Sequence, residues 1–236
     1  SGKTTTLYSA LAELNSLEKK LITVEDPVEY RLPGINQVQV NDKIELTFAR
    51  VLSSAMRQDP DIVLVGEMRD QETAQIGLRA AMTGHLVLST LHTNDAASTP
   101  LRLMDMGVPR YMVGSSLQAV LAQRLVRVIC ESCTAPHQPT PAEHEWLRHE
   151  LREHVDKARF FHGKGCSHCN GMGYRGRTGV YELLEMTQAV VDASNHPDPA
   201  PFLKAAHLEM AGATLRRHAV QLAVQGRTTV AEAMRI

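Results

Sequence analysis

The chain has 236 residues, and its 25 Lys and Arg residues against 26 Asp and Glu give a formal net charge of -1. A chain of this length can bury one large hydrophobic core and add a small further domain. Balanced charge and an aromatic content of 4% argue against a nucleic-acid surface, which needs clustered cations and stacking rings. No apolar stretch approaches the roughly 20 residues of a membrane-spanning helix, and no signal peptide is expected.

The first residues carry the end of a phosphate-binding pattern. Gly2, Lys3 and Thr4 match the last three positions of the P-loop sequence G-x-x-x-x-G-K-[ST]. In that loop the lysine reaches the β- and γ-phosphates and the hydroxyl binds Mg²⁺. Residues 5–17 are predicted to continue as a helix whose N-terminus faces the same anion. The motif alone also fits an ordinary helix start. Because the chain begins inside the motif and without Met, we expect it to be a fragment of a longer protein.

Three short apolar segments follow, and helical patterns separate them. The segments are residues 21–24, 62–65 and 85–90, and the helices are predicted at residues 47–57 and 72–82. This alternation predicts a parallel α/β sheet that is covered on both faces. Each segment ends in acidic or polar residues, and ligands of such sheets bind beyond the carboxyl ends of the strands. We therefore expect carboxylates and an imidazole to converge on one crevice.

All four cysteines lie in two Cys-x-x-Cys pairs. They are Cys130, Cys133, Cys166 and Cys169. Two such pairs supply the four thiolates of a closed tetrahedral site, so we predict a structural Zn²⁺. The alternatives are buried thiols or a redox disulfide, although nothing in the sequence indicates an oxidising compartment. We expect His168 to be a loop residue, because four thiolates already complete the coordination shell.

The rest of the second half is predicted to be mainly helical. An amphipathic helix is predicted at residues 111–121, and a charged, solvated helical insertion at residues 141–161. A short strand at residues 180–184 precedes two helices. These helices are predicted at residues 201–209 and 213–224, after a proline-rich linker at residues 195–201.

Three further motifs resemble those of a known ATPase family. Residues 22–29 resemble the Asp box of secretion ATPases, residues 59–70 their Walker B motif and residues 83–95 their His box. With the P-loop residues, they make the chain similar to the ATPases of type II secretion and type IV pilus assembly over essentially its whole length. Retraction ATPases of the same superfamily generally lack the four-cysteine element, so this element favours the assembly and secretion branch.

The resemblance implies an α/β fold and a domain organisation. We expect a RecA-like P-loop NTPase core with a tetracysteine zinc-knuckle insertion and a helical C-terminal segment. The implied boundaries are residues 1–128 for the core, 129–177 for the metal-binding subdomain and 178–236 for the C-terminal segment.

The resemblance also implies roles for individual residues. Glu29 would be the general base for the attacking water, and Glu67 would hold the hydration shell of Mg²⁺. His92 would sense the γ-phosphate or couple it to domain movement. Two acids and a histidine near phosphate suit in-line attack by water. For Glu25 and Glu29 the alternative is a solvated acidic turn. The implied ATP-binding residues are Gly2, Lys3, Thr4 and Thr5, with Mg²⁺ on Thr4.

Arg50 and Arg57 are candidates for contact with a phosphate or a neighbouring subunit. Because they are seven residues apart on one predicted helix, they share a face about 10 Å apart. The simpler alternative is a pair of solvated helix charges. The family usually has another Arg between them, where this chain has Ser53. Since a hydroxyl cannot replace a guanidinium, that contact is either dispensable here or this copy is weakened.

The function that the resemblance implies is ATP hydrolysis that powers assembly of type IV pili or of a type II secretion pseudopilus. The family implies a homo-oligomeric, hexameric ring in the cytoplasm, at the inner-membrane platform of the pilus or secretion system. One alternative is a degenerate, non-hydrolysing ring or docking component, which Ser53 would mark. Another is a nucleic-acid translocase. Near-neutral charge and few aromatic residues disfavour it, and no nucleic-acid partner is expected.

Overall fold

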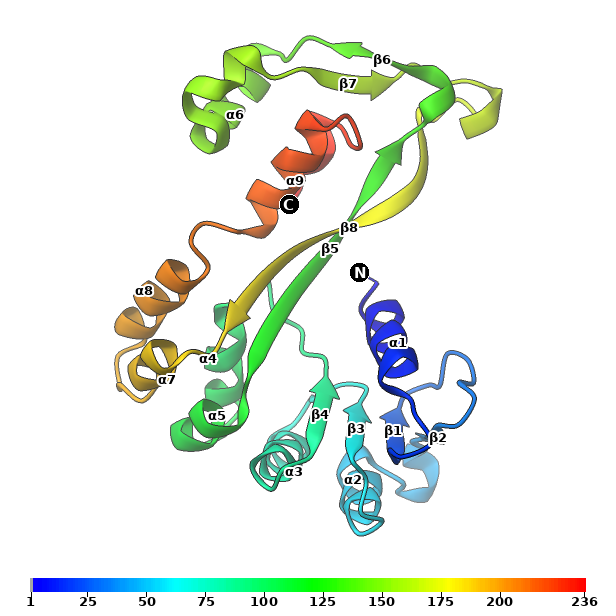
Figure 1. The fold of residues 1–236 in the computed structure, drawn as a ribbon, viewed down its shortest axis with the longest axis vertical. Coiled ribbons are helices and arrows are strands. Elements are labelled where there is room, and N and C mark those ends of the chain that lie inside the picture. Colours follow the sequence, from blue (N-terminus) through cyan, green and yellow to red (C-terminus); the bar gives the residue numbers. More distant parts are fainter. Residues whose placement is uncertain (1) are drawn as a thin grey trace. The chain divides into compact units, whose positions relative to one another are not determined.

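A computed structural model describes residues 2–236 (Figure 1). The chain forms two compact units. The first, which we call the sheet unit, contains residues 3–120 and 184–209. The second, which we call the cysteine unit, contains Gly2 and residues 121–183 and 210–236. The chain therefore enters each unit more than once.

A parallel four-stranded sheet forms the centre of the sheet unit. Its strands are β1 (Leu21–Glu25), β2 (Asn36–Gln39), β3 (Ile62–Val65) and β4 (Leu86–Ser89), in the order β2-β1-β3-β4. The register pairs Val24 with Val65 and Val65 with Ser89. Because β1, β3 and β4 are parallel and level, their carboxyl ends meet at one edge of the sheet. The three strands predicted from the sequence are confirmed.

Helices cover both faces of this sheet (Figure 1). On one face, Ile62 and Leu64 pack with Leu11 of α1. On the other, Val63 and Val65 pack with α2, α3, α4 and α5. Successive strand residues point to opposite faces, so a strand buried on both sides reads as one apolar run. The helices of this unit are α1 (Lys3–Leu14), α2 (Phe48–Met56), α3 (Gln71–Met82), α4 (Ser98–Asp105), α5 (Arg110–Ser116), α7 (Gln188–Ser194) and α8 (Pro199–Glu209), with a 3₁₀ helix at Asp42–Ile44.

Side-chain caps explain where two of the predicted helices begin. The Thr47 hydroxyl accepts a hydrogen bond from the Arg50 amide at 3.3 Å and caps α2. Asp70 accepts one from the Thr73 amide at 2.8 Å and caps α3. Such caps satisfy amides that have no partner within the helix. The helices predicted at 47–57 and 72–82 agree with the observed bounds of α2 and α3 to within one residue at each end.

The cysteine unit combines two small sheets with helices. Strand β5 (Ala119–Ile129) pairs with β8 (Tyr174–Glu185), and β6 (Thr134–His137) is antiparallel to β7 (Phe160–Gly163). The helices are α6 (Pro141–Leu151), α9 (Leu215–Val224) and α10 (Val230–Ala233), with 3₁₀ helices at Glu131–Cys133, Arg152–Lys157 and Ser167–Cys169. One hydrophobic core contains Val126 of β5, Leu147 of α6 and Val220 of α9.

Two predictions for the second half are wrong in part. The helix predicted at 111–121 ends at Ser116, and residues from Ala119 form strand β5. The insertion predicted as helical at 141–161 is helical through Lys157, but its last residues enter strand β7 at Phe160. It is not simply solvated, because Leu147 and Val155 are fully or almost fully buried. Its charged residues surround a small apolar face that packs into the core of the unit.

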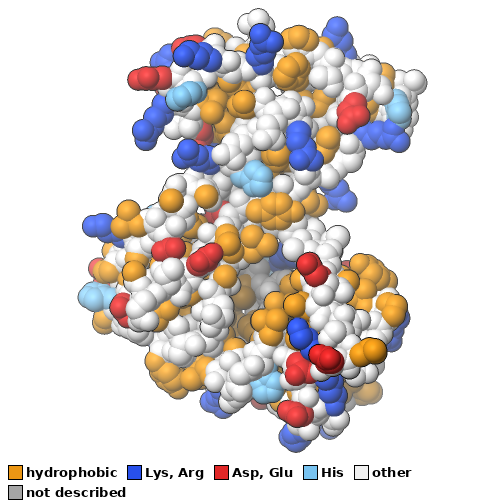
Figure 2. Space-filling model, viewed as in Figure 1, with side chains coloured by type: hydrophobic (Ala, Val, Ile, Leu, Met, Phe, Trp, Pro, Cys, Tyr) orange, Lys and Arg blue, Asp and Glu red, His pale blue; other side chains and the backbone are white. Residues whose placement is uncertain are grey.

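The surface is mixed in charge. Basic and acidic side chains are interspersed on the face shown in Figure 2, as expected for a net charge of -1. Among residues 2–236, no helix combines the length and the apolar character that crossing a bilayer requires.

Candidate functional site

Charged side chains from three strand ends meet in the sheet unit. Glu67 follows β3, His92 follows β4 and Asp26 follows β1. His92 Nε2 lies 3.0 Å from Glu67 Oε1. Arg69 Nε donates to Glu67 Oε2 at 2.6 Å, and Arg69 Nη1 lies 3.5 Å from Asp26 Oδ2. The predicted convergence of a carboxylate and an imidazole at this edge is therefore present.

Backbone contacts hold the loops that carry Glu67 and His92. The Gly66 amide donates to the Val24 carbonyl at 2.7 Å, and the Met68 amide donates to the Thr90 carbonyl at 3.1 Å. The Thr90 hydroxyl returns a hydrogen bond to the Gly66 carbonyl at 2.8 Å. The strand ends on both sides of the carboxylate are thus tied together.

Glu67 and His92 differ sharply in exposure. The Glu67 side chain is 17% exposed, and both of its oxygens have a partner. Its hydrogen bond and its charge raise the pKa of Arg69 above the usual value, so this guanidinium stays charged. The His92 ring is 76% exposed. Glu67 is a fixed acceptor, whereas His92 remains accessible to a ligand.

The P-loop residues lie at the start of α1. Lys3 Nζ donates to the carbonyl of Leu91, the neighbour of His92, at 3.2 Å. No acidic residue lies in the first turn of α1, so nothing there offsets the positive end of the helix. Thr4 is partly buried and Thr5 is exposed. Gly2 has a φ of +76°, which favours glycine, and a Cβ there would lie 2.9 Å from Gln123 Nε2.

The two acidic residues of the predicted turn have different surroundings. Glu25 is 3% exposed and bonds to Tyr8, Thr23 and Gln37. The solvated-turn alternative is therefore wrong for Glu25. Glu29 is exposed, and its amide donates to the Tyr8 hydroxyl at 3.3 Å. No ion pair of the Glu29 carboxylate occurs within residues 2–236.

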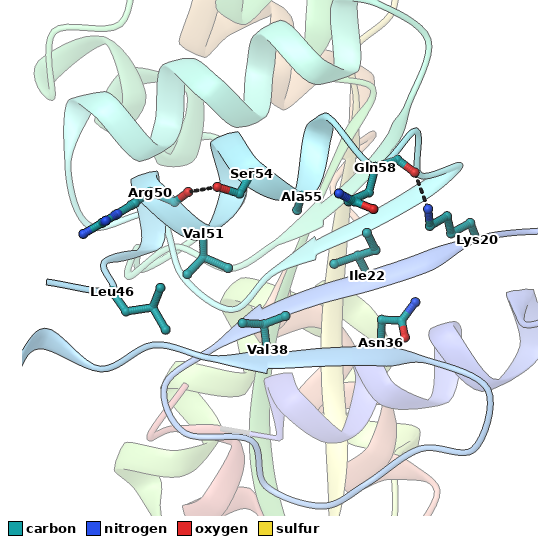
Figure 3. Close-up of a pocket in the computed structure, with 10 residues that line it drawn as sticks. All are labelled: Lys20, Ile22, Asn36, Val38, Leu46, Arg50, Val51, Ser54, Ala55 and Gln58. Carbon is teal, nitrogen blue, oxygen red and sulfur yellow. Dashed lines mark hydrogen bonds between the residues drawn. The ribbon is translucent and has the colours of Figure 1, made fainter. Parts of the chain in front are cut away.

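Arg50 and Arg57 lie on the exposed side of α2. Arg50 donates to the Glu45 carbonyl at 3.3 Å and Arg57 to the Ser54 hydroxyl at 3.4 Å. Within the described part of the chain, neither guanidinium is paired with Glu67 or His92. Figure 3 shows Arg50 at one end of a groove of about 490 Å³ and Lys20 at the other. The groove is lined with residues of β1, β2 and α2 and has an apolar floor.

The four cysteines form one cluster in the cysteine unit. The Sγ distances are 3.9 Å for Cys130–Cys166, 3.9 Å for Cys133–Cys169 and 3.8 Å for Cys166–Cys169. These sulfurs are too far apart for disulfides, and all four thiols are free. A tetrahedral ion with bonds of about 2.3 Å places its sulfur ligands about 3.8 Å apart. The four ligand atoms lie within 4.8 Å of one another, so the cluster can hold a metal ion.

Close backbone packing brings the two halves of the cluster together. The Cys130 amide donates to the Gly173 carbonyl at 3.0 Å. A Cβ on Gly163 would lie only 2.0 Å from that same carbonyl oxygen. Gly173 itself has a φ of +75°. Glycine is therefore required at both positions, because a side chain would separate the hairpins that carry the cysteines.

Two thiols of this cluster, Cys133 and Cys169, have strongly different pKa values. Burial raises the pKa of Cys169, but the amides of Cys166 and Gly173 outweigh burial and lower it to about 6. Burial, together with the neighbouring thiols, raises the pKa of Cys133 to about 12. Cys169 therefore forms a thiolate readily, whereas ionisation of Cys133 needs a cation beside it.

Two features of these sites were not predicted from the sequence. Arg69 bridges two strand ends, and its position two residues after Glu67 is a signal that could have identified it. The hydrogen bonds among Tyr8, Glu25 and Gln37 join residues 12 to 29 positions apart. No local pattern marks them.

Comparison with solved structures defines the class of protein. The pilus retraction motor PilT with bound ADP matches with a TM-score of 0.72 at 30% identity, over 100% of this chain and 57% of that one. The Legionella pneumophila ATPase DotB matches with a TM-score of 0.68 at 23% identity, over 99% of this chain and 56% of that one. The chain therefore has the α/β fold of these ATPases, with a RecA-like core.

The sequence relationship is more specific than the fold. The chain belongs to the family described as type II/IV secretion system protein, whose model matches residues 1–235. Type II secretion system protein E of Aeromonas hydrophila is 45% identical over 100% of this chain and 46% of its own length. The type IV pilus assembly ATPase PilB of Myxococcus xanthus is 44% identical over 98% of this chain and 41% of its own length. The resemblance to this family is confirmed, and the chain spans less than half the length of these relatives.

Proposed function

We propose that this chain is the ATP-hydrolysing part of a motor that powers assembly of type IV pili or of a type II secretion pseudopilus. The observation that carries the proposal is the convergence of Glu67, His92 and Lys3 at one sheet edge in a chain of this family. Relatives from the two systems are 45% and 44% identical. This near equality supports either system, so the proposal includes both.

The start of α1 is proposed to bind the phosphates of ATP. The Lys3 ammonium would exchange its hydrogen bond with the Leu91 carbonyl for phosphate oxygens. The free amides at this helix end would add further donors. Gly2, Thr4 and Thr5 complete the proposed nucleotide-binding residues. The Thr4 hydroxyl would hold Mg²⁺, which neutralises phosphate charge when bound.

Glu29 and Glu67 are proposed to divide the work of hydrolysis. Both Glu67 oxygens are held by donors, so this carboxylate suits a fixed acceptor that orients water around Mg²⁺. The exposed Glu29 carboxylate is free to take the proton of the attacking water. The water oxygen bonds to the γ-phosphorus while the bond to the bridging oxygen breaks, so that ADP leaves. His92, exposed beside Glu67, would contact the γ-phosphate.

The tetracysteine cluster is proposed to hold one structural Zn²⁺. Four sulfur ligands at tetrahedral spacing support zinc and leave no open position for substrate. Zinc would supply the positive charge that allows all four thiols to ionise. Its role would be to join the hairpins of the cysteine unit.

The proposed assembly state and location are supported by the family alone. We propose a homo-oligomer, a hexameric ring, in the cytoplasm at the inner-membrane platform of the machine. Exposed Arg50 and Arg57 are available for contact with a neighbouring subunit or a phosphate.

The test is ATP turnover by the intact protein that contains this chain. Glu29→Gln and Glu67→Gln should each lower turnover by about 10²-fold or more while ATP still binds. Calorimetry measures the binding and phosphate release measures the rate. Wild-type protein that binds ATP without hydrolysing it would instead support the degenerate, non-hydrolysing component. Near-wild-type rates in both variants would refute the assigned roles.

A further inference from the structure

A buried hydrogen-bond network lies between helix α1 and the loop that carries Glu29. Tyr8 is 1% exposed and Glu25 is 3% exposed. The Tyr8 hydroxyl donates to Glu25 Oε2. Gln37 Nε2 lies 3.2 Å from Glu25 Oε1 and 3.4 Å from the Tyr8 hydroxyl. The network thus joins α1, β1 and β2.

The same network holds four consecutive residues of the loop between β1 and β2. Two of its members, Tyr8 and Gln37, make all four contacts. In chain order, the contacts are the Glu29 amide to the Tyr8 hydroxyl at 3.3 Å, Gln37 Nε2 to the Tyr30 carbonyl at 3.1 Å, Arg31 Nη1 to the Gln37 carbonyl at 3.0 Å and the Leu32 amide to Gln37 Oε1 at 2.7 Å. The loop backbone around Glu29 is therefore fixed although the Glu29 side chain is exposed.

The direction of these hydrogen bonds is well defined. Burial, aided by the hydrogen bond and charge of Glu25, raises the pKa of Tyr8 to about 12, so the hydroxyl keeps its proton. That single proton goes to Glu25, and the oxygen lone pairs accept from the Glu29 amide. Tyr8 also lies four residues after Thr4, hence on the same face of α1 one turn further along.

We propose that Tyr8 is a positioning residue that fixes Glu29 relative to the start of α1. This inference rests on the proposed function, in which α1 binds phosphate and Glu29 receives the proton of water. Glu25 and Gln37 hold the Tyr8 hydroxyl in place, and the hydroxyl holds the Glu29 amide. The start of α1 and the proposed base Glu29 then keep a fixed position relative to each other. Without the hydroxyl, a shift of about 1 Å in the base can slow a reaction about 10²-fold.

Tyr8→Phe in the intact protein is the first test. We expect kcat for ATP to fall roughly tenfold to a hundredfold, with KM for ATP changed less than about twofold. Calorimetric stoichiometry of one ATP per chain would show that the variant retains its sites. Tyr30→Phe is the matched control. The Tyr30 ring packs at 4.7 Å from the Tyr8 ring, and this substitution removes only the Tyr30 hydroxyl, so the backbone contacts of the loop stay intact. Its kcat should equal that of wild type.

A double-mutant cycle with Glu29→Gln separates positioning from a general structural role. If Tyr8 acts through Glu29, adding Tyr8→Phe to Glu29→Gln should change the single-turnover rate less than about twofold. A further tenfold loss in the double variant, or a wild-type kcat for Tyr8→Phe, would overturn the inference. If Tyr8→Phe yields too little folded protein, Gln37→Met replaces it in the same cycle and tests the network as a whole, because it removes the contacts of Gln37 with the Tyr8 hydroxyl, the Tyr30 carbonyl and the Leu32 amide. A further tenfold loss in that double variant would overturn the inference. Glu29→Gln at the wild-type rate would refute the proposed base, and this inference with it. Loss in Glu29→Gln alone, with Tyr8→Phe at wild type, refutes only the inference.

Discussion

Replacing Glu232, a buried carboxylate of the cysteine unit, should cost this unit measurable stability. Glu232 is 4% exposed. It accepts hydrogen bonds from the Arg127 amide at 2.9 Å, the Arg127 guanidinium at 2.8 Å and the Arg235 guanidinium at 2.9 Å. Burial opposes ionisation, but these donors outweigh it and lower the pKa of Glu232 from its ordinary 4.5 to about 2. The folded protein therefore favours the carboxylate.

The pKa sets the size and the pH dependence of the effect. A carboxyl pKa that falls from 4.5 to about 2 on folding contributes about 3 kcal/mol at neutral pH. Because both guanidinium groups are about half exposed or more, we expect Glu232→Gln to lose about 2–3 kcal/mol at pH 7. The folded pKa lies below the unfolded one, so this contribution is present above about pH 4.5 and disappears toward pH 2. Gln does not titrate, so the difference between the proteins should shrink by about 0.8 kcal/mol between pH 7 and pH 4.

Urea unfolding followed by tryptophan fluorescence measures this effect. Trp146 is the single tryptophan of the chain, and it packs against the core that contains Val230 and Ala233 of α10. The exposed Glu153 of the same unit provides the matched control, and Glu153→Gln should stay within about 0.5 kcal/mol of wild type. A loss below about 0.5 kcal/mol for Glu232→Gln at pH 7, or a difference that grows toward pH 4, would refute the reasoning.

The cysteine cluster and its close backbone contact can be tested in the same unit. Cys133→Ser should lower bound zinc to less than half an equivalent in elemental analysis, while Ser132→Ala retains a full equivalent; full zinc in Cys133→Ser would exclude Cys133 as a ligand. Gly163→Ala should lower the urea midpoint of Trp146 fluorescence, because the added methyl group would lie 2.0 Å from the Gly173 carbonyl oxygen. An unchanged midpoint would contradict that close approach.

The parallel sheet and its strand ends could be predicted because local signals determine them. The four apolar residues of β3 are all buried, as a strand covered on both faces requires. Parallel connections then place the residues after β3 and β4 at one edge. Glu67 and His92 were therefore predicted neighbours although 25 positions separate them in the sequence. The cysteine cluster could be predicted equally well, because the spacing of the two cysteines within each pair is a local feature of the sequence.

Elements that depend on distant partners could not be predicted. Residues 119–121 have the apolar character of a helix end, and only pairing with β8, more than 50 residues away, makes them part of a strand. The buried Leu147 is surrounded in sequence by charged residues, and its partners in α9 lie about 70 positions later. The role of Tyr8 likewise depends on Gln37, which is 29 positions away. In each case tertiary contact outweighs local pattern.

The cysteine cluster and the C-terminal helices stabilise a single structure. Val126 lies on β5, which ends just before Cys130, and Phe160 lies on β7, which precedes Cys166. Both residues pack in one core with Val220 of α9 and Val230 of α10. Neither the hairpins nor the helices could bury such a core alone, since both are short. Glu232 adds a second connection, because its carboxylate in α10 binds the Arg127 amide of β5. The cysteine cluster and the contacts between Glu232 and Arg127 therefore lie near the same end of β5 and act on the same folding unit. Zinc at the cysteine cluster, as proposed, would stabilise the helices as well as the hairpins, because binding energy that requires the folded hairpin is shared by everything that folds with it.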